Sequence, residues 1–100
     1  MTPKAIRKTL DTAQQRLERP PSQQDLGVAV ACLETVAIAT IGTPAQASAI
    51  WALSAAGRAA ACDMSWGKQH LVECALGHLD ATRDQLRVVI AKQNMIRTEQ

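Results

Sequence analysis

The sequence predicts an all-α fold, a compact bundle of four helices with short connections, and two observations carry this prediction. Phe and Tyr are absent and Trp occurs twice, so Leu, Ile, Val and Ala dominate an apolar fraction of 47%. Ala has the highest helix propensity, whereas strands favour aromatic and β-branched residues. Apolar residues also recur at spacings of three and four, as in an amphipathic helix. We expect residues 1–100 to form one helical domain, because this length suits a single core.

The first predicted helix follows an N-cap at Thr2, starts at Pro3 and stops at Arg19, because Pro20 and Pro21 cannot continue it. Its predicted buried face consists of Ile6, Leu10, Ala13 and Leu17. The first turns also carry a basic cluster, namely Lys4, Arg7 and Lys8. The helix dipole prefers anions there, and each such charge costs about 0.3–1 kcal/mol. The cluster is therefore either an ordinary solvated helix end or a basic spot for an acidic partner.

The second predicted helix begins after Ser22, with Asp25 completing a variant of the capping box, and runs to about Ile41. One apolar face is expected to comprise Leu26, Val30, Leu33, Ala37 and Ile41. Further apolar residues spread around the rest of the helix, namely Val28, Val36 and Ile38. A helix that is apolar nearly all round is buried on several sides, so we expect this one at the centre of the fold.

Capping signals mark the third predicted helix. Gly42 suits the position after a helix end, Thr43 is the expected N-cap, Pro44 the first helical residue and Gln46 the capping-box partner. The helix then runs to about Cys62. One side carries only small residues, which are Ala45, Ala49, Ala52, Ala56 and Ala60. A neighbouring helix can approach such a side closely, near the short end of the usual spacing of about 8–10 Å.

After a break at residues 63–67, capped by Asp63 or Ser65, the fourth helix is predicted from about Trp66 to Ile96. Its apolar stripe comprises Leu71, Ala75, Leu79, Thr82, Leu86 and Ile90, widened by Val72, Leu76 and Val89. The opposite side alternates in charge through Asp80, Arg83, Asp84 and Arg87. We expect ion pairs three residues apart there, each stabilising the helix by about 0.2–0.5 kcal/mol.

The two tryptophans lie at different kinds of position in the sequence. Trp51 lies in the middle of the third helix and is expected to pack in the core. Trp66 lies at the break between Ser65 and Gly67, where it either closes the end of the bundle or anchors a partner.

Only His70, Cys74 and His78 show a spacing typical of metal ligands. Two side chains four residues apart on a helix can share a zinc ion, but eight residues rise about 12 Å, so the third cannot easily join. We therefore expect Cys74 in the core with the histidines at its rim, and neither a metal nor another cofactor. A Cys–His nucleophile lacks a third orienting group, and no phosphate loop or carboxylate pair appears, so we expect no enzyme.

The sequence favours a cytoplasmic protein. Cys32, Cys62 and Cys74 are an odd number without paired spacing, which is typical of reduced, buried thiols. The chain begins with an amphipathic pattern rather than an apolar signal core. The longest apolar stretch, residues 26–41, contains Glu34 and is shorter than the roughly 20 residues of a membrane span, so we expect no membrane association.

The balanced charge of the chain excludes two classes of function. A net charge of +2 is too balanced for a dedicated nucleic-acid binder and excludes an acidic DNA mimic. A module that binds a protein, and no nucleic acid directly, remains. Its candidate anchors are Arg7, Lys8, Arg16, Trp66, Arg83 and Arg87.

The alternative is a small helix-turn-helix-like DNA-binding or plasmid-maintenance regulator, with Gly42 in the turn and residues 43–58 as the recognition helix. Gln46 and Ser48 would then face base edges. Arg58 is the only charge on that helix, and phosphate contacts supply much of the affinity for DNA, so this alternative is disfavoured.

In its length, its Ala- and Gln-rich helical composition and its lack of enzymatic motifs, the chain resembles the small all-helical anti-CRISPR proteins of phages and mobile elements. The resemblance covers the whole chain at the level of composition, and no diagnostic motif carries it. It implies an inhibitor in the cytoplasm of a bacterial host, which binds a CRISPR–Cas surveillance complex and blocks target DNA binding or a conformational step. It assigns no role to any residue.

Overall fold

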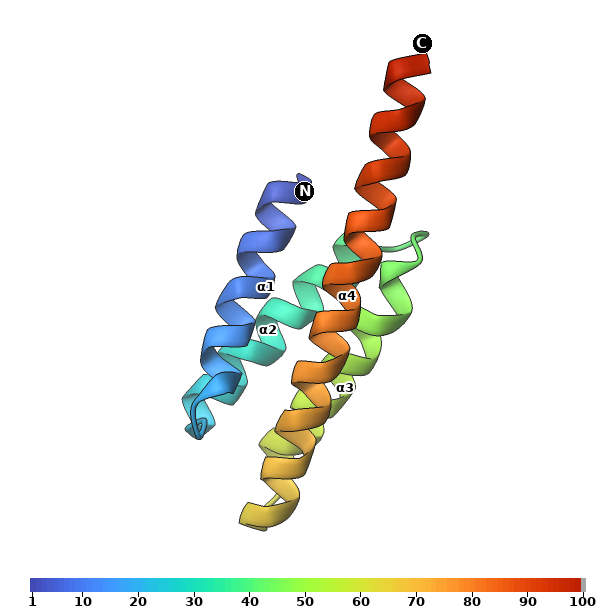
Figure 1. Ribbon diagram of the computed structural model, residues 1–100. Helices are drawn as coiled ribbons and strands as arrows, with labels where there is room; N and C mark the ends of the chain where they lie inside the picture. Colours follow the sequence, from blue (N-terminus) through green and yellow to red (C-terminus); the bar gives the residue numbers. More distant parts are fainter. Residues whose placement is uncertain (100) are drawn as a thin grey trace.

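The computed structural model describes residues 1–99, and these residues form four helices with short connections (Figure 1). The helices are α1 (Pro3–Glu18), α2 (Gln23–Ala39), α3 (Ala45–Ala61) and α4 (Ser65–Glu99). The predicted all-α class and the number of helices are confirmed. α4 begins just before the predicted start and continues past Ile96. Its 35 residues span about 52 Å and account for almost all of the 54 Å length of the molecule.

The four helices form a ring, in which each packs against two others. α1 packs against α2 and α4, and α3 packs against α2 and α4, whereas within residues 1–99 no Cα atom of α2 lies within 8 Å of one in α4. The prediction that the second helix occupies the centre is therefore wrong. A ring leaves one side of every helix outside, and on α2 that side carries Ile38, which is 63% exposed, followed by Ile41, which is 65% exposed. None of the helices in the described part of the chain is long and apolar enough to cross a membrane.

Local capping signals place most of the helix ends correctly. The Thr2 hydroxyl accepts a hydrogen bond from the Ala5 amide at 3.1 Å, and Ser22 and Asp25 form both halves of the predicted capping box. Gly42 has a φ of +82°, which other residues rarely adopt. The third helix starts one residue late, at Ala45, because the Thr43 hydroxyl turns to the Thr40 carbonyl and to the Ala45 amide.

The core lies between the helices along the length of the ring. The predicted face of α1 is buried in full, and the α3 alanines are buried as predicted except Ala60, which is half-buried. α3 and α4 share the most extensive contact, which agrees with the close approach that the small residues allow. On α4 the fully buried set is shifted slightly from the predicted stripe, and it comprises Val72, Ala75, Leu79, Thr82 and Leu86.

Candidate partner-binding surface

The structure separates the six predicted anchor residues into three places. Arg7, Arg83 and Arg87 line one shallow cavity between α1 and α4, and Lys8 is exposed on the same end of α1. Arg16 lies near the other end of α1, and Trp66 lies at the start of α4. The fold therefore brings three of the six together, from segments about 80 residues apart in the chain, and leaves two elsewhere.

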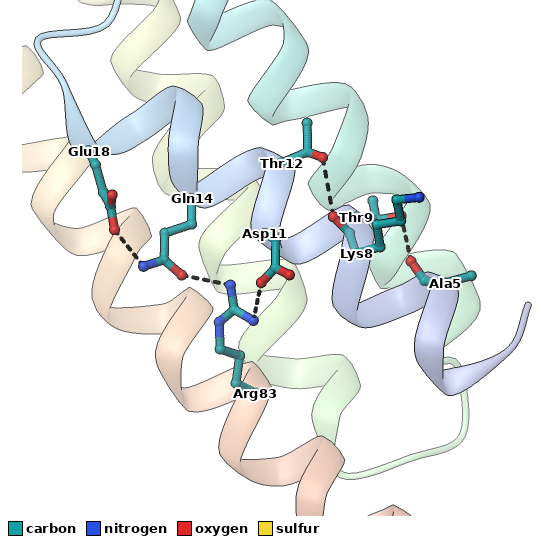
Figure 2. A network of polar contacts seen from close by, with 8 residues as sticks. All are labelled: Ala5, Lys8, Thr9, Asp11, Thr12, Gln14, Glu18 and Arg83. Atoms are coloured by element: carbon teal, nitrogen blue, oxygen red, sulfur yellow. Dashed lines mark hydrogen bonds and ion pairs between the residues drawn. The ribbon is translucent and has the colours of Figure 1, made fainter.

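The sequence predicts Arg83 on the solvent-exposed side of the fourth helix, but in the structure Arg83 joins α4 to α1 (Figure 2). Its guanidinium lies 2.8 Å from an Asp11 carboxylate oxygen and donates a hydrogen bond of 2.6 Å to Gln14 Oε1. The Gln14 amide donates onward to Glu18, so one chain of contacts runs along α1. The Arg83 side chain is only 20% exposed. Of the two ion pairs expected along α4, the one between Asp80 and Arg83 does not form, because Arg83 pairs with Asp11 instead. The other forms between Arg87 and Asp84 at 3.4 Å.

We therefore expect Arg83→Ala to lower the free energy of unfolding by about 1–2 kcal/mol, since hydrogen bonds to charged groups are worth about 1.5–3 kcal/mol and exposure of Asp11 reduces that value. Arg87→Ala is the matched control. Arg87 and Asp84 are both more than 70% exposed, so its loss is expected to change stability by less than about 0.5 kcal/mol. Urea denaturation measures both values. Equal free energies of unfolding for the two variants would show that the contact of Arg83 with Asp11 and Gln14 does not stabilise the fold.

Arg16 is also engaged within the chain. It forms a 3.0 Å ion pair with Asp25 across the α1–α2 connection, and its side chain remains 44% exposed. The backbone amide of Ser22, followed by the Arg16 guanidinium, stabilises the Asp25 carboxylate and lowers the pKa of Asp25 below its ordinary value of 3.8. Arg16 thus supports the α1–α2 corner, and a partner that binds it would compete with Asp25 for the guanidinium.

Both tryptophans lie outside the core. Trp51 is 62% exposed and stacks on His78 of α4, with ring centroids 6.1 Å apart, so the prediction of a buried Trp51 is wrong. The physical reason is its position on the helix: Trp51 lies about 100° around the axis from Ala52, away from the buried alanine side of α3. Trp66 is 71% exposed and does not close the end of the bundle.

Between α1 and α4, an apolar groove opens on the far side of the Arg83 contact. We call it the α1–α4 groove. It consists of two cavities, of about 140 and 160 Å³, which share Leu86 and Ile90 as lining residues. Most of the lining comes from the start of α1 and from residues 86–93 of α4, and the second cavity is closed at one end by Ala39, Thr40 and Thr43, at and after the end of α2. The sequence predicts Leu86, Val89 and Ile90 on the apolar stripe of the fourth helix. Leu86 is buried as predicted, whereas Val89 and Ile90 are only half-buried, because helical spacing cannot show how far a neighbouring helix covers a face.

The rim of the α1–α4 groove is basic. Arg7, Arg83 and Arg87 line one cavity, and no Asp or Glu is among the described residues that line either cavity. Lys4 and Lys8 are exposed on neighbouring turns of α1, whose first turn carries no acidic residue. The positive end of the α1 dipole lies at the same place. These charges together favour an anionic ligand.

Metal ligation finds no geometric support in the part of the chain that the structure describes. Cys74 Sγ lies 3.7 Å from His70 Nε2, while His78 faces Trp51 instead, and no group of three potential ligands gathers within residues 1–99. Cys32, Cys62 and Cys74 are free thiols as expected. They are half-buried rather than buried, and burial raises the pKa of Cys32.

Chelation is accordingly expected to leave the melting temperature unchanged, since a structural zinc ion would contribute directly to the free energy of folding. The measurement is a thermal melt with and without EDTA, accompanied by zinc analysis of the purified protein. A lower melting temperature in EDTA, together with bound zinc, would contradict this expectation and make His70 and Cys74 the first ligands to test.

The comparisons with known proteins add no functional information: no family model, no curated protein and no solved structure matches this chain.

Proposed function

We propose that this protein is a non-enzymatic interaction module, which captures a protein partner through the basic surface around the α1–α4 groove. The observation that supports it is the convergence of Arg7, Arg83 and Arg87 on one open cavity that no described carboxylate lines. Arg83 is committed to Asp11, whereas Arg7 forms no ion pair with any side chain that the structure describes, and Arg87 forms only an exposed one. Arg7 and Arg87 are thus available for bidentate contacts with carboxylates.

As the partner class to test first, we propose a bacterial CRISPR–Cas surveillance complex, occluded in its DNA-binding channel or held in one conformation. The support is the resemblance of the whole chain to small helical anti-CRISPR proteins in length and composition. The DNA-binding alternative receives less support. The α3 helix offers a single charged residue, Arg58, where phosphate contacts would be needed, and its other exposed side chains are uncharged.

We expect the double charge reversal Arg7→Glu/Lys8→Glu to weaken partner capture about 30-fold or more, because losing a buried interfacial charge pair costs about 2–5 kcal/mol. The assay is comigration of the purified protein with a CRISPR–Cas complex on native gels, and capture from a bacterial lysate in parallel. Circular dichroism checks that the helices remain.

Arg58→Glu, a charge reversal on exposed α3 surface, is the control and is expected to leave capture intact. If Arg7→Glu/Lys8→Glu captures the partner at wild-type affinity, the basic surface is not the binding site, and exposed Trp66 becomes the candidate. Binding to naked duplex DNA that falls steeply with salt would instead support a regulator.

A further inference from the structure

The α1–α4 groove has the position and shape of a docking site for one helix. α4 continues past the N-terminal end of α1, so that its last turns have no neighbouring helix (Figure 1). The Arg83 contact with Asp11 and Gln14 holds the two helices together at one end of the groove (Figure 2). Beyond that contact, residues near the start of α1 and residues 86–93 of α4 line an open trough, which Ala39, Thr40 and Thr43 bound at the end of α2.

The floor of the groove is apolar and accommodates side chains of aliphatic size. Ile6 and Leu86 are buried, while Val89 and Ile90 are half-buried, so the floor is anchored in the core and partly accessible. A cavity of about 150 Å³ admits a group as large as benzene. The two cavities, about 140 and 160 Å³, therefore each have room for one apolar side chain. Two anchors on adjacent turns are how an amphipathic helix binds in a groove.

The charge of the rim selects among occupants. A second copy of this chain would place one basic rim against another, since Lys4, Arg7, Lys8 and Arg87 gather at this end. A nucleic acid would leave the apolar floor unused and would need more phosphate contacts than the rim provides. A helix with acidic residues beside its apolar stripe satisfies both the floor and the rim.

We propose that the α1–α4 groove binds one amphipathic helix of a partner protein, with its apolar stripe on Leu86, Val89 and Ile90 and with Asp or Glu side chains on Arg7 and Arg87. This inference rests on the proposed function, that of a module which binds protein, and adds which element of the partner is recognised. Affinity comes from the floor, and the rim sets the orientation and the salt dependence.

The probe is a labelled synthetic peptide long enough to form a stable helix, about 15 residues, with Leu at helical spacing and Glu on the flanking positions. Two further peptides serve as comparisons: a scrambled isomer of the same composition, and a version with Lys in place of Glu. Fluorescence anisotropy measures binding to the full chain. We expect the acidic amphipathic peptide to bind about tenfold or more tightly than either comparison peptide, with an affinity that falls as salt rises.

Adjacent valines of α4 give a matched pair of variants. Val89→Asp places a carboxylate in the floor of the groove, whereas Val88→Asp makes the same change at a position that is 48% exposed and lines neither cavity. We expect Val89→Asp and Arg87→Glu each to weaken peptide binding about tenfold or more, and Val88→Asp to leave it unchanged.

Equal binding of the scrambled peptide, equal loss in Val88→Asp and Val89→Asp, or no binding of the acidic peptide would each overturn the inference. Circular dichroism of each variant separates loss of binding from loss of fold. The proposed function fails separately, when Arg7→Glu/Lys8→Glu still captures the partner. If that capture depends on Arg7 and Lys8 but is intact in Val89→Asp, the module binds its partner through the basic residues without the groove. The proposed function then stands, and the inference of a helix-binding groove is overturned.

Discussion

Replacing Leu33 by Ala is expected to lower the free energy of unfolding by about 2–5 kcal/mol, the usual range for a buried Leu. Leu33 is completely buried on the inner side of α2, which packs between α1 and α3. Truncation removes the apolar contacts of the side chain and leaves a cavity that the rigid ring of helices closes only in part. Urea denaturation monitored by circular dichroism at the helical signal measures the loss.

Glu34→Ala is the control for this experiment, because Glu34 is the next residue in the chain and is exposed on the outer side of α2. Its replacement is expected to change stability by less than about 0.5 kcal/mol. Arg83→Ala is unsuitable as a neutral control, because Arg83 connects α4 to α1. If the variants at Leu33 and Glu34 are equally stable, the assignment of inner and outer sides of α2 is incorrect.

The second large effect is expected from enlarging the alanine side of α3. Ala52 is completely buried in a helix that packs on both α2 and α4. Ala52→Leu adds three carbon atoms where there is no free surface, and such overpacking destabilises by about 1–3 kcal/mol and occasionally more. A lower melting temperature, together with a retained helical signal, is the expected result, because the helices are displaced rather than unwound.

Ala47→Leu makes the identical substitution on the same helix at an exposed position. It therefore corrects for the difference in helix propensity between Ala and Leu, and we expect a change of less than about 0.5 kcal/mol. Equal melting temperatures for Ala52→Leu and Ala47→Leu would contradict close packing at α3.

The sequence alone determined the features that depend on a few neighbouring residues. The N-cap at Thr2, the capping box of Ser22 and Asp25 and the turn at Gly42 are local hydrogen-bonding and backbone preferences, and the structure confirms each of them. The buried face of α1 followed from helical spacing for the same reason, because the positions along one helix fix which side chains share a side.

Tertiary structure alone decided which apolar and charged side chains remain free. Periodicity defines a face but not the number of neighbours it meets, so α2 appeared central although the ring gives it only two. Trp51 was expected inside, but the side of α3 that meets the other helices is the alanine side, and Trp51 lies off that side and remains exposed.

The candidate site divides in the same way. Arg7 and Arg87 could be named from the sequence as exposed cations, but the partners of Arg83 are 69 residues away from it at Gln14 and further still at Asp11. The α1–α4 groove forms where the start of α1 meets residues 86–93 of α4, at opposite ends of the chain, with Ala39, Thr40 and Thr43 from the middle of the chain beside them. No local sequence pattern predicts that these distant segments meet, because their contact arises from the packing of whole helices and from α4 being longer than α1.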